Sequence, residues 1–397
     1  MTHEKRLRPR GFAVALLAAL SPAAILPGCK DKVTSASAAP IPVAAPTPTA
    51  APPPPAAGSL HGICPDKIVI QIDWYATPER AAAFQLVGPG GTIDKKKGTY
   101  SGPLAGTGVS VEVRLGGPFI GFQPIPALMY QDPSIYLGYV ATDDAVQAAE
   151  KFPTKAVVAP LDINPQIVMW DPSTYKVDTW SDVAKTKAKI VYIEGMPFMD
   201  FLVSKGYVTA AQKDASFDGT PSRFVAERGK LMQQAYASNE PYRWEHDVPA
   251  WKKPVKFLLV HDSGYSIYPQ GLAVRSAQFD AAKACLKVLV PLVQKAQIAY
   301  VSQPGPTNDT LIEIAKTLGD GPPITAAGNA NAVVVMKDLH IVGNGPDQTL
   351  GNFDLARVES TIALLRPIFA ARGTKIPEKL AAADIVSNEF IDPSLHL

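Results

Sequence analysis

KIVIQIDWY, residues 67–75, and PERAAAFQLVG, residues 78–88, decide the fold class of this chain. The first stretch is apolar and β-branched and predicts a strand, whereas the second consists of helix formers behind a proline and predicts a helix. The same order returns at residues 135–152, where a strand ending in acidic residues leads into a helix. Strands that alternate with helices predict parallel sheets with crossover helices, the α/β class.

More strands and one more helix are expected further along the chain. Strands are predicted at 109–115, 155–163, 165–170, 188–195 and 256–265, and a helix at 199–206. Residues 88–108 are rich in Gly, Lys, Thr and Ser, and we expect a loop insertion there. A Gly-, Pro- and Asn-rich stretch at 304–352 is a second insertion.

Ligands of α/β sheets bind beyond the carboxyl ends of the strands, so the polar residues at those ends are candidate ligand contacts. These candidates are Asp73, Trp74, Gly116, Gly117, Pro118, Thr142, Asp143, Asn164, Glu194, Gly195, Ser263 and Tyr265.

Residues 1–28 have the layout of a signal peptide. Four basic residues precede an apolar run that is broken by Ser21 and Pro22 and is too short to span a bilayer comfortably. The run ends in Leu-Pro-Gly-Cys, which resembles a lipobox and would lipidate Cys29. The alternative is an ordinary secretory signal in which Cys29 is incidental. In both cases we expect export, to the periplasm or to the outer face of the cell membrane.

Residues 29–60 form a predicted stalk behind the anchor. Lys30 to Leu60 contains eight prolines and nine alanines and no aromatic residue, a composition that cannot build a core and favours extended polyproline II. The rest of the chain is longer than one core usually holds and predicts two lobes. No stretch after residue 61 is expected to cross a membrane.

Charge and cysteine content narrow the function classes further. The 38 basic and 36 acidic residues nearly balance, and no basic stripe interleaved with aromatic residues indicates a nucleic-acid partner. Cys64 and Cys285 could pair in an oxidising compartment, or one could be a buried thiol and the other a surface thiol.

Catalytic and metal-binding signatures are missing from the sequence. It contains no HExxH, CxxC, GxxxxGK or GxSxG motif, and its six histidines lack ligand spacing. His261, Asp262 and Ser263 have the residue types of a triad, but adjacent residues on a strand point to opposite faces. We therefore expect no catalytic residue, no metal and no cofactor.

Four landmarks, in their order along the chain, resemble a known family. They are Asp73-Trp74 followed by Pro78 and Glu79, VEVRLGGP at 111–118, VATDDAV at 140–146 with NPQIVMWDPSTYKVDTWSDV at 164–183, and YASNEPYRWE at 236–245; the closing VSNEFIDPS at 386–394 fits as well. Together they resemble the periplasmic solute-binding proteins of ABC importers for nitrate, sulfonates such as taurine, and thiamine pyrimidine precursors.

The resemblance implies a type II clamshell of two lobes joined by two crossing strands. Lobe one would comprise residues 61–163 and 267–397, and lobe two residues 164–266. Glu240 and Tyr242 stand where the family has its lobe-two pocket turn, which adds them to the candidate ligand contacts. The implied partners are a small-molecule solute and an ABC transporter permease, and we expect a monomer.

Several candidates also have an interpretation without a ligand. Trp74 could belong to the core, and Asp73 and Asp143 could cap helices. Glu240 could have no role other than shaping the turn before its proline, and the Gly116–Gly117 pair could be needed only for the backbone conformation.

The residues favour a neutral or cationic nitrogen-containing solute, either pyrimidine-like or an amine. Two aromatic residues, Trp74 and Tyr242, each lie near a carboxylate and could hold a ring with N–H donors or a small cation. Nitrate or an aliphatic sulfonate would instead need basic residues, of which Arg114 and Arg223 are the nearest. Two other functions stay open: a secreted enzyme that acts on a small heterocycle, and a sensory lipoprotein that kept the clamshell without transport.

Overall fold

The computed structural model describes residues 59–319, 321 and 324–397. The predicted signal peptide, Cys29 and nearly all of the predicted stalk lie outside the described residues.

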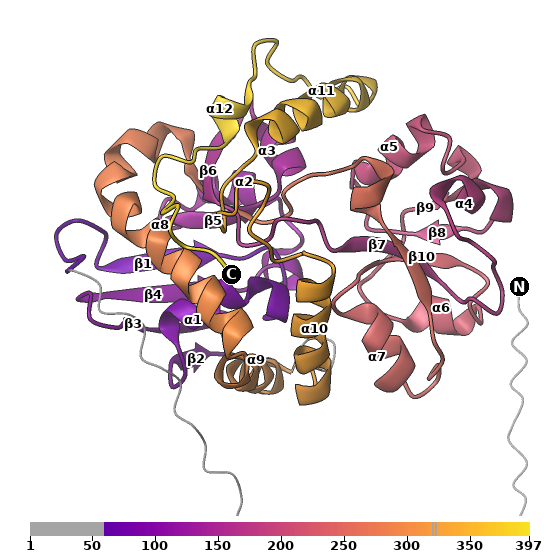
Figure 1. Cartoon of the computed structure of the whole chain (residues 1–397), viewed down its shortest axis with the longest axis horizontal. Helices are drawn as coiled ribbons and strands as arrows, with labels where there is room; N and C mark the ends of the chain where they lie inside the picture. The colour runs from indigo at the N-terminus through magenta and orange to yellow at the C-terminus, as the bar shows by residue number, and fades with distance from the viewer. Residues whose placement is uncertain (1–58, 320, 322–323) are drawn as a thin grey trace, which may run out of the picture. The chain divides into compact units, whose positions relative to one another are not determined.

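The first of two sheets contains seven strands in the order β2-β3-β4-β1-β5-β12-β6 (Figure 1). Its strands are β1 Lys67–Gln71, β2 Thr92–Asp94, β3 Thr99–Leu104, β4 Val109–Arg114, β5 Leu137–Val140, β6 Thr154–Val158 and β12 Gly271–Arg275. β1 is parallel to both β4 and β5, and β12 runs antiparallel to β5 and β6. The parallel centre confirms the α/β prediction.

The expected loop insertion at residues 88–108 is wrong, because this segment forms β2 and β3. β2 is antiparallel to β3, and β3 is antiparallel to β4, so the segment is a hairpin at the edge of the first sheet. Tyr100 and Leu104 of β3 are buried, and they provide the apolar face that a strand requires. Gly102 and Pro103 lie between them and disguise the strand in the sequence.

The second sheet takes all its strands from residues 166–259, in the order β11-β7-β10-β8-β9. They are β7 Gln166–Trp170, β8 Ile190–Val191, β9 Lys213–Asp214, β10 Met232–Tyr236 and β11 Lys256–Leu259. β8 is parallel to β9 and β10, whereas β7 is antiparallel to β10 and β11. The strand predicted at 256–265 is shorter than expected, because residues 260–263 turn into a 3-10 helix.

Twelve α-helices surround the sheets in the described part of the chain. They are α1 Ala81–Val87, α2 Ile125–Gln131, α3 Thr142–Ala148, α4 Trp180–Thr186, α5 Phe198–Ser204, α6 Ser222–Ala226, α7 Glu240–His246, α8 Phe279–Ser302, α9 Gly305–Leu318, α10 Ala326–Asp338, α11 Leu355–Ala371 and α12 Ala382–Ile385. Around the first sheet, α1 packs against α8 and α3 packs against α11. The predicted insertion at 304–352 thus contains two full helices, α9 and α10.

The long helix α8 is part of the core. By length and composition alone the helix over Ser276–Ser302 could cross a membrane, although no such segment was predicted after residue 61. However, 61% of its most apolar window is buried inside the protein. Cys285 of α8 forms a disulfide with Cys64, which precedes β1. The bond therefore ties the beginning of the described chain to a helix 221 residues later.

Two segments connect the sheets, residues 159–165 between β6 and β7 and residues 260–270 between β11 and β12. Arg357 of α11 bonds to both of them. Its guanidinium donates to Asp162 Oδ1 at 2.8 Å on the first segment, and to the carbonyl oxygens of Ser266 at 2.6 Å and Ile267 at 2.8 Å on the second. One side chain thus fixes the two connections relative to each other.

The C-terminal helices also contact the second lobe. α10 contacts α7, and α11 contacts α5; in Figure 1, α10 stands beside the strands of the second sheet, near α7. Thr325 Oγ1, at the N-cap of α10, donates to Asp247 Oδ2 at 3.2 Å. The two lobes therefore touch at points away from the connecting segments.

Candidate functional site

A cavity of about 330 Å³ is lined by residues from both sheets. Its walls follow the carboxyl ends of the parallel strands β1, β4 and β5 in the first sheet and of β8 and β10 in the second. Because β7 runs antiparallel to β10, the beginning of β7 lies at the same edge and contributes Asn164 and Gln166. The strand ends of both lobes therefore face one space, as expected for a ligand site of α/β sheets.

Eight of the fourteen candidates from the sequence line this cavity: Asp73, Trp74, Gly117, Asp143, Asn164, Glu194, Gly195 and Glu240. Six do not: Gly116, Pro118, Thr142, Tyr242, Ser263 and Tyr265.

Three of these six residues have roles in the local backbone structure instead: Gly116, Thr142 and Ser263. A Cβ atom on Gly116 would lie 2.3 Å from the carbonyl oxygen of Ile72, so only glycine allows this close approach of the chain to β1. Thr142 Oγ1 is bonded to the backbone of Tyr268, and Ser263 Oγ donates to the carbonyl oxygen of Val260. Pro118 lies in the 3-10 helix Gly117–Ile120 and contributes no lining atom.

The two tyrosines that the sequence placed in the cavity contact other groups. Tyr242 lies on the helix α7 and stacks on His246, with ring centroids 4.3 Å apart. This departs from the expectation that Tyr242 and Glu240 act together, because residues two apart on a helix point in different directions. Tyr265 is buried behind the wall, and its hydroxyl donates to Asp143 Oδ2 at 2.7 Å.

Asp73 is paired with the buried Arg80. The guanidinium donates to both carboxylate oxygens, Nε to Oδ1 at 2.8 Å and Nη2 to Oδ2 at 2.6 Å. Burial alone would lower the pKa of Arg80, but the charge and the hydrogen bonds of Asp73, together with the charges of Tyr236 and Glu79, raise that pKa above its usual range. Glu79, fully buried beside Arg80, accepts a hydrogen bond from Ser238 Oγ of the second lobe. This cluster thus lines the cavity and joins the two lobes.

Asp143 and Asp144 form a second acidic wall, in the first turn of α3. Neither forms an ion pair with a Lys or Arg of the described residues. Burial raises the pKa of Asp143 despite the hydrogen bond from Tyr265. Burial, followed by the negative charges of Asp143 and Asp73, raises the pKa of Asp144 well above its usual range.

The second lobe adds Glu240 and Tyr236. Glu240 Oε2 accepts from the backbone N–H of Tyr236 at 2.7 Å, and Oε1 lies 3.7 Å from Arg243. Burial raises the pKa of Glu240 although Arg243 lowers it. Burial likewise raises the pKa of the Tyr236 hydroxyl. The cavity thus combines several carboxylates with a single cation of its own lining, Arg80, which is already paired.

Aromatic rings form the apolar part of the wall. Trp74 is half-buried and contacts Tyr75 and Phe122, with ring centroids 5.5 and 5.9 Å away. A Cβ atom on Gly219 of the second lobe would lie 3.7 Å from the Trp74 ring, so this ring reaches across to the other lobe. Trp74 therefore lies between the lobes and not in the core of either one.

Several lining residues were not predicted from the sequence. They are Glu79, Arg80, Tyr139, Gln166, Met196, Phe217, Gln234 and Tyr236, among others. Glu79 and Arg80 follow a proline at the start of a helix, which predicts a solvent-exposed turn, and nothing local reveals that Asp73 pairs with Arg80. Tyr236 and Gln234 belong to a strand that no apolar run marks, because MQQAY contains two glutamines.

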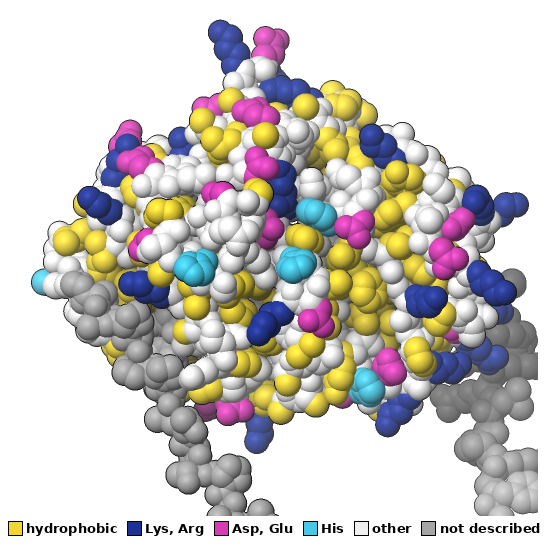
Figure 2. Space-filling view, viewed as in Figure 1, with side chains coloured by type: hydrophobic (Ala, Val, Ile, Leu, Met, Phe, Trp, Pro, Cys, Tyr) yellow, Lys and Arg dark blue, Asp and Glu magenta, His cyan; other side chains and the backbone are white. Residues whose placement is uncertain are grey.

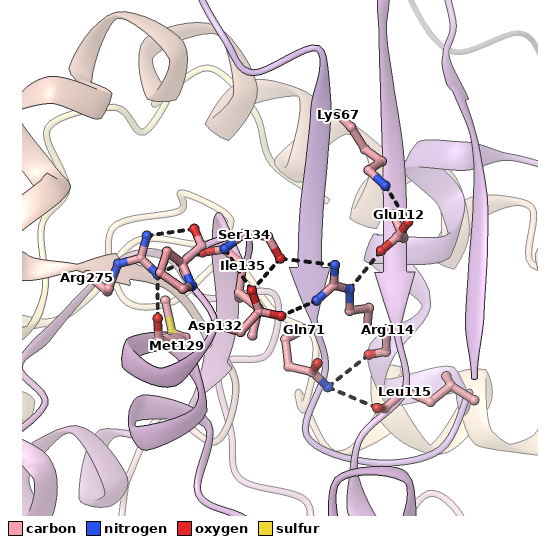
Figure 3. Close-up of polar contacts among 11 residues, drawn as sticks. Lys67, Gln71, Glu112, Arg114, Leu115, Met129, Asp132, Ser134, Ile135 and Arg275 are labelled. Carbon is pink, nitrogen blue, oxygen red and sulfur yellow. Dashed lines mark hydrogen bonds and ion pairs between the residues drawn. The ribbon is translucent and has the colours of Figure 1, made fainter. Parts of the chain in front are cut away.

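The two arginines that could have bound an anion are occupied elsewhere. Figure 3 shows Arg114 directed at Glu112, Asp132 and Ser134, with Nη1 to Asp132 Oδ2 at 2.7 Å. Arg223 pairs with Asp214 at 2.9 Å. On the face drawn in Figure 2, acidic and basic side chains are interspersed. Neither arginine lines the cavity.

His261, Asp262 and Ser263 show no relay geometry. Ser263 Oγ donates to Val260, and His261 Nδ1 is buried without a partner. The described residues contain no group of three or more His, Cys, Asp or Glu that could hold a metal ion.

This chain resembles known proteins in its fold and not in its sequence. No family model and no curated protein matches the sequence. Among solved structures, the periplasmic aliphatic sulphonate binding protein SsuA from Escherichia coli is similar over 81% of this chain and 98% of its own, with 15% identity and a TM-score of 0.52.

Two other structures cover a comparable share of the chain. A ligand-binding component of an ABC-type import system from Staphylococcus aureus and an ABC transporter structure from Parabacteroides distasonis each match over 82% of this chain and 100% of their own, with 12% and 11% identity and TM-scores of 0.49. The similarity to SsuA shows that this chain shares the fold of that protein, and its two sheets form the two lobes of this α/β fold.

Proposed function

We propose that this chain is an exported, lipid-anchored solute-binding protein that captures a small nitrogen-containing molecule and delivers it to an ABC importer. The observation that carries the proposal is the cavity itself. Its lining comes from the strand ends of both lobes, so a bound solute would add contacts between them and favour the closed arrangement.

Export is supported by the Cys64–Cys285 disulfide, because such bonds persist in oxidising compartments. The signal-like residues 1–28 and Cys29 support the same conclusion from the sequence. SsuA is named as a periplasmic protein, and its fold is the one found here.

The charge of the cavity favours a neutral or cationic solute over nitrate or a sulfonate. An anion would meet the carboxylates of Asp143 and Glu240, and no unpaired arginine of the lining could compensate for them. A cationic or N–H-bearing ring would instead find acceptors beside aromatic faces.

Solution scattering combined with a turnover assay tests this proposal. A library of small solutes would first be screened for compounds that raise the melting temperature. We expect a stabilising compound to reduce the radius of gyration and to be recovered chemically unchanged. Chemical conversion of the compound would favour a secreted enzyme, and stabilisation by no compound would favour a sensory lipoprotein that does not capture solutes.

A further inference from the structure

The cavity contains hydrogen-bond donors that have no oxygen acceptor. Asn164 is 1% exposed, and its Oδ1 accepts from the backbone N–H of Gln166 at 3.1 Å. This bond fixes the orientation of the amide, and Nδ2 then has no hydrogen-bond partner among the residues that the structure describes. Leaving a buried N–H group unpaired destabilises the protein, so this atom indicates a missing acceptor.

Gln234 of strand β10 likewise has a fixed amide oxygen and an amide N–H group without an oxygen acceptor. Its Oε1 accepts from the backbone N–H of Ile193 at 3.0 Å, which again fixes the amide. Its Nε2 reaches only the thioether sulfur of Met196, at 3.1 Å, and sulfur is a weak acceptor. Asn164 and Gln234 are both lining residues of the cavity, so two side-chain amides with unsatisfied N–H groups lie at its wall.

The first lobe presents the opposite chemistry. Asp143 and Asp144 line the cavity from α3. The Tyr265 hydroxyl donates to Asp143 Oδ2 at 2.7 Å and the backbone N–H of Asp144 donates to Asp143 Oδ1 at 3.1 Å, whereas the Asp144 carboxylate accepts no hydrogen bond from the described residues. Arg372 is the cation whose charge acts on Asp143, but its guanidinium is bonded to Asp200 and to backbone carbonyls of the second lobe. The adjacent carboxylates therefore have room for N–H donors from a ligand.

We propose that the cavity selects an organic cation that also carries a neutral hydrogen-bond acceptor. The N–H groups of its cationic end bind the Asp143–Asp144 carboxylates of the first lobe, and its acceptor binds the amide donors of Asn164 and Gln234 of the second. This inference rests on the proposed function and specifies the chemical class of the solute.

A charged acceptor does not fit this arrangement. Asp73, Glu79 and Glu240 also line the cavity, and Arg80, the basic residue of the lining, is already bonded to Asp73. A ligand carboxylate or sulfonate would be repelled by these groups, whereas a carbonyl oxygen or a ring nitrogen would not. The acceptor is therefore uncharged.

Isothermal titration calorimetry with four matched probes tests the two ends separately. 3-(Aminomethyl)pyridine has an ammonium group and a ring nitrogen, benzylamine lacks the ring nitrogen, 3-methylpyridine lacks the ammonium group, and ethanesulfonate is an anion. Near neutral pH we expect 3-(aminomethyl)pyridine to bind about tenfold more tightly than benzylamine and 3-methylpyridine, which corresponds to about 1.4 kcal/mol for each missing end. Ethanesulfonate should not bind measurably.

Protein variants test which residues bind the ammonium group and which bind the ring nitrogen of the probe. Replacing both carboxylates, Asp143→Asn with Asp144→Asn, should abolish the advantage of 3-(aminomethyl)pyridine over 3-methylpyridine, and the exposed Glu245→Gln should leave it intact. Gln234→Glu keeps an acceptor for the Ile193 N–H but removes the amide donor, so it should abolish the advantage of 3-(aminomethyl)pyridine over benzylamine. If Gln234→Glu does not fold, the comparison of 3-(aminomethyl)pyridine with benzylamine on the wild-type protein still tests the site for the neutral acceptor.

The outcomes separate this inference from the proposed function. Tighter binding of ethanesulfonate, or equal binding of benzylamine and 3-(aminomethyl)pyridine, would overturn the inference while solute capture stands. Loss of the ammonium preference in Glu245→Gln as well as in the double variant would also overturn it. The absence of saturable binding by any probe and by every member of the solute library would overturn solute capture together with it.

Discussion

At the scale of single residues, the cavity retains groups that do not help the unliganded protein. Asp144 and Asp143 are adjacent carboxylates without a basic partner among the described residues, and their burial raises the pKa of each. Asn164 Nδ2 is buried without an acceptor. Such costs persist where function requires the groups, and a bound solute would remove them.

Asp144→Asn is expected to raise the melting temperature of the unliganded protein near neutral pH. The pKa of Asp144 is higher in the folded protein than in the unfolded chain, so the folded state binds protons more tightly. Stability of the wild type should therefore rise as pH falls through the raised pKa, and the variant should lose this part of the rise. Differential scanning fluorimetry from about pH 8 to pH 5 measures both effects. A lower melting temperature at neutral pH would mean that the carboxylate has a structural role.

Trp74→Ala should weaken solute binding by more than tenfold, about 1.4 kcal/mol, and leave the melting temperature nearly unchanged. Trp74 is half-buried between the lobes and its ring reaches toward Gly219, so its removal exposes no core. Phe84→Ala is the matched control, because Phe84 is fully buried in the first lobe and its loss should cost stability instead. Normal binding by Trp74→Ala would show that the solute site lies elsewhere.

At the scale of elements, the end of α11 holds a wall of the cavity. The guanidinium of Arg372 donates to Asp200 Oδ2 at 2.7 Å, to the carbonyl oxygen of Gly195 at 2.6 Å and to that of Met196 at 3.1 Å. Gly195 and Met196 line the cavity. Arg372, which follows the last turn of α11, thus binds a loop of the second lobe that lines the cavity.

Arg372→Gln should accelerate solute dissociation by about tenfold, because hydrogen bonds to charged groups contribute roughly 1.5–3 kcal/mol. The association rate should change little, because Arg372 itself does not line the cavity. Arg366→Gln is the control: Arg366 donates to carbonyl oxygens of Pro377 and Leu380 within the first lobe, and its loss should leave dissociation unchanged. Stopped-flow dissociation kinetics distinguishes the two variants, and equal rates would contradict a role of Arg372 in closure.

The disulfide stabilises the first lobe from outside the cavity. Cys285→Ser should lower the free energy of unfolding by roughly 2–5 kcal/mol, because Cys64 and α8 are no longer linked in the unfolded chain. Urea denaturation measures the loss. Reduction with dithiothreitol should destabilise the wild type similarly and leave Cys285→Ser unaffected, and an unchanged wild type would show that the bond contributes little.

At the scale of the whole molecule, the sequence predicted the architecture better than the chemistry. The strand over residues 67–71 and the polar tips Asp73, Asp143 and Glu194 were predictable, because apolar runs mark buried strands and α/β sheets bind ligands at their carboxyl ends. The hairpin at 92–104 was not, since Gly and Pro hide its alternation.

The remaining site residues depend on tertiary structure. The approach of Asn164, which precedes β7, to Gln234 of β10 is a consequence of sheet order and register, which local patterns do not encode. The pairing of Asp73 with Arg80 depends on the path of the chain between β1 and α1, which no local pattern marks. Tyr265 was predicted as a ligand contact because it follows a strand, yet it lies behind Asp143 and orients that carboxylate. Proximity to a strand end therefore predicts the neighbourhood of a site but not which side chains face it.

Native mass spectrometry of the protein purified under non-denaturing conditions tests solute capture most directly. We expect the folded protein to carry a small molecule that is ejected on collisional activation and detected as a positive ion, and the Asp143→Asn and Asp144→Asn double variant to lack it. A protein observed only at its bare mass, which also gains no mass when cationic, neutral and anionic solutes are offered, would contradict the account.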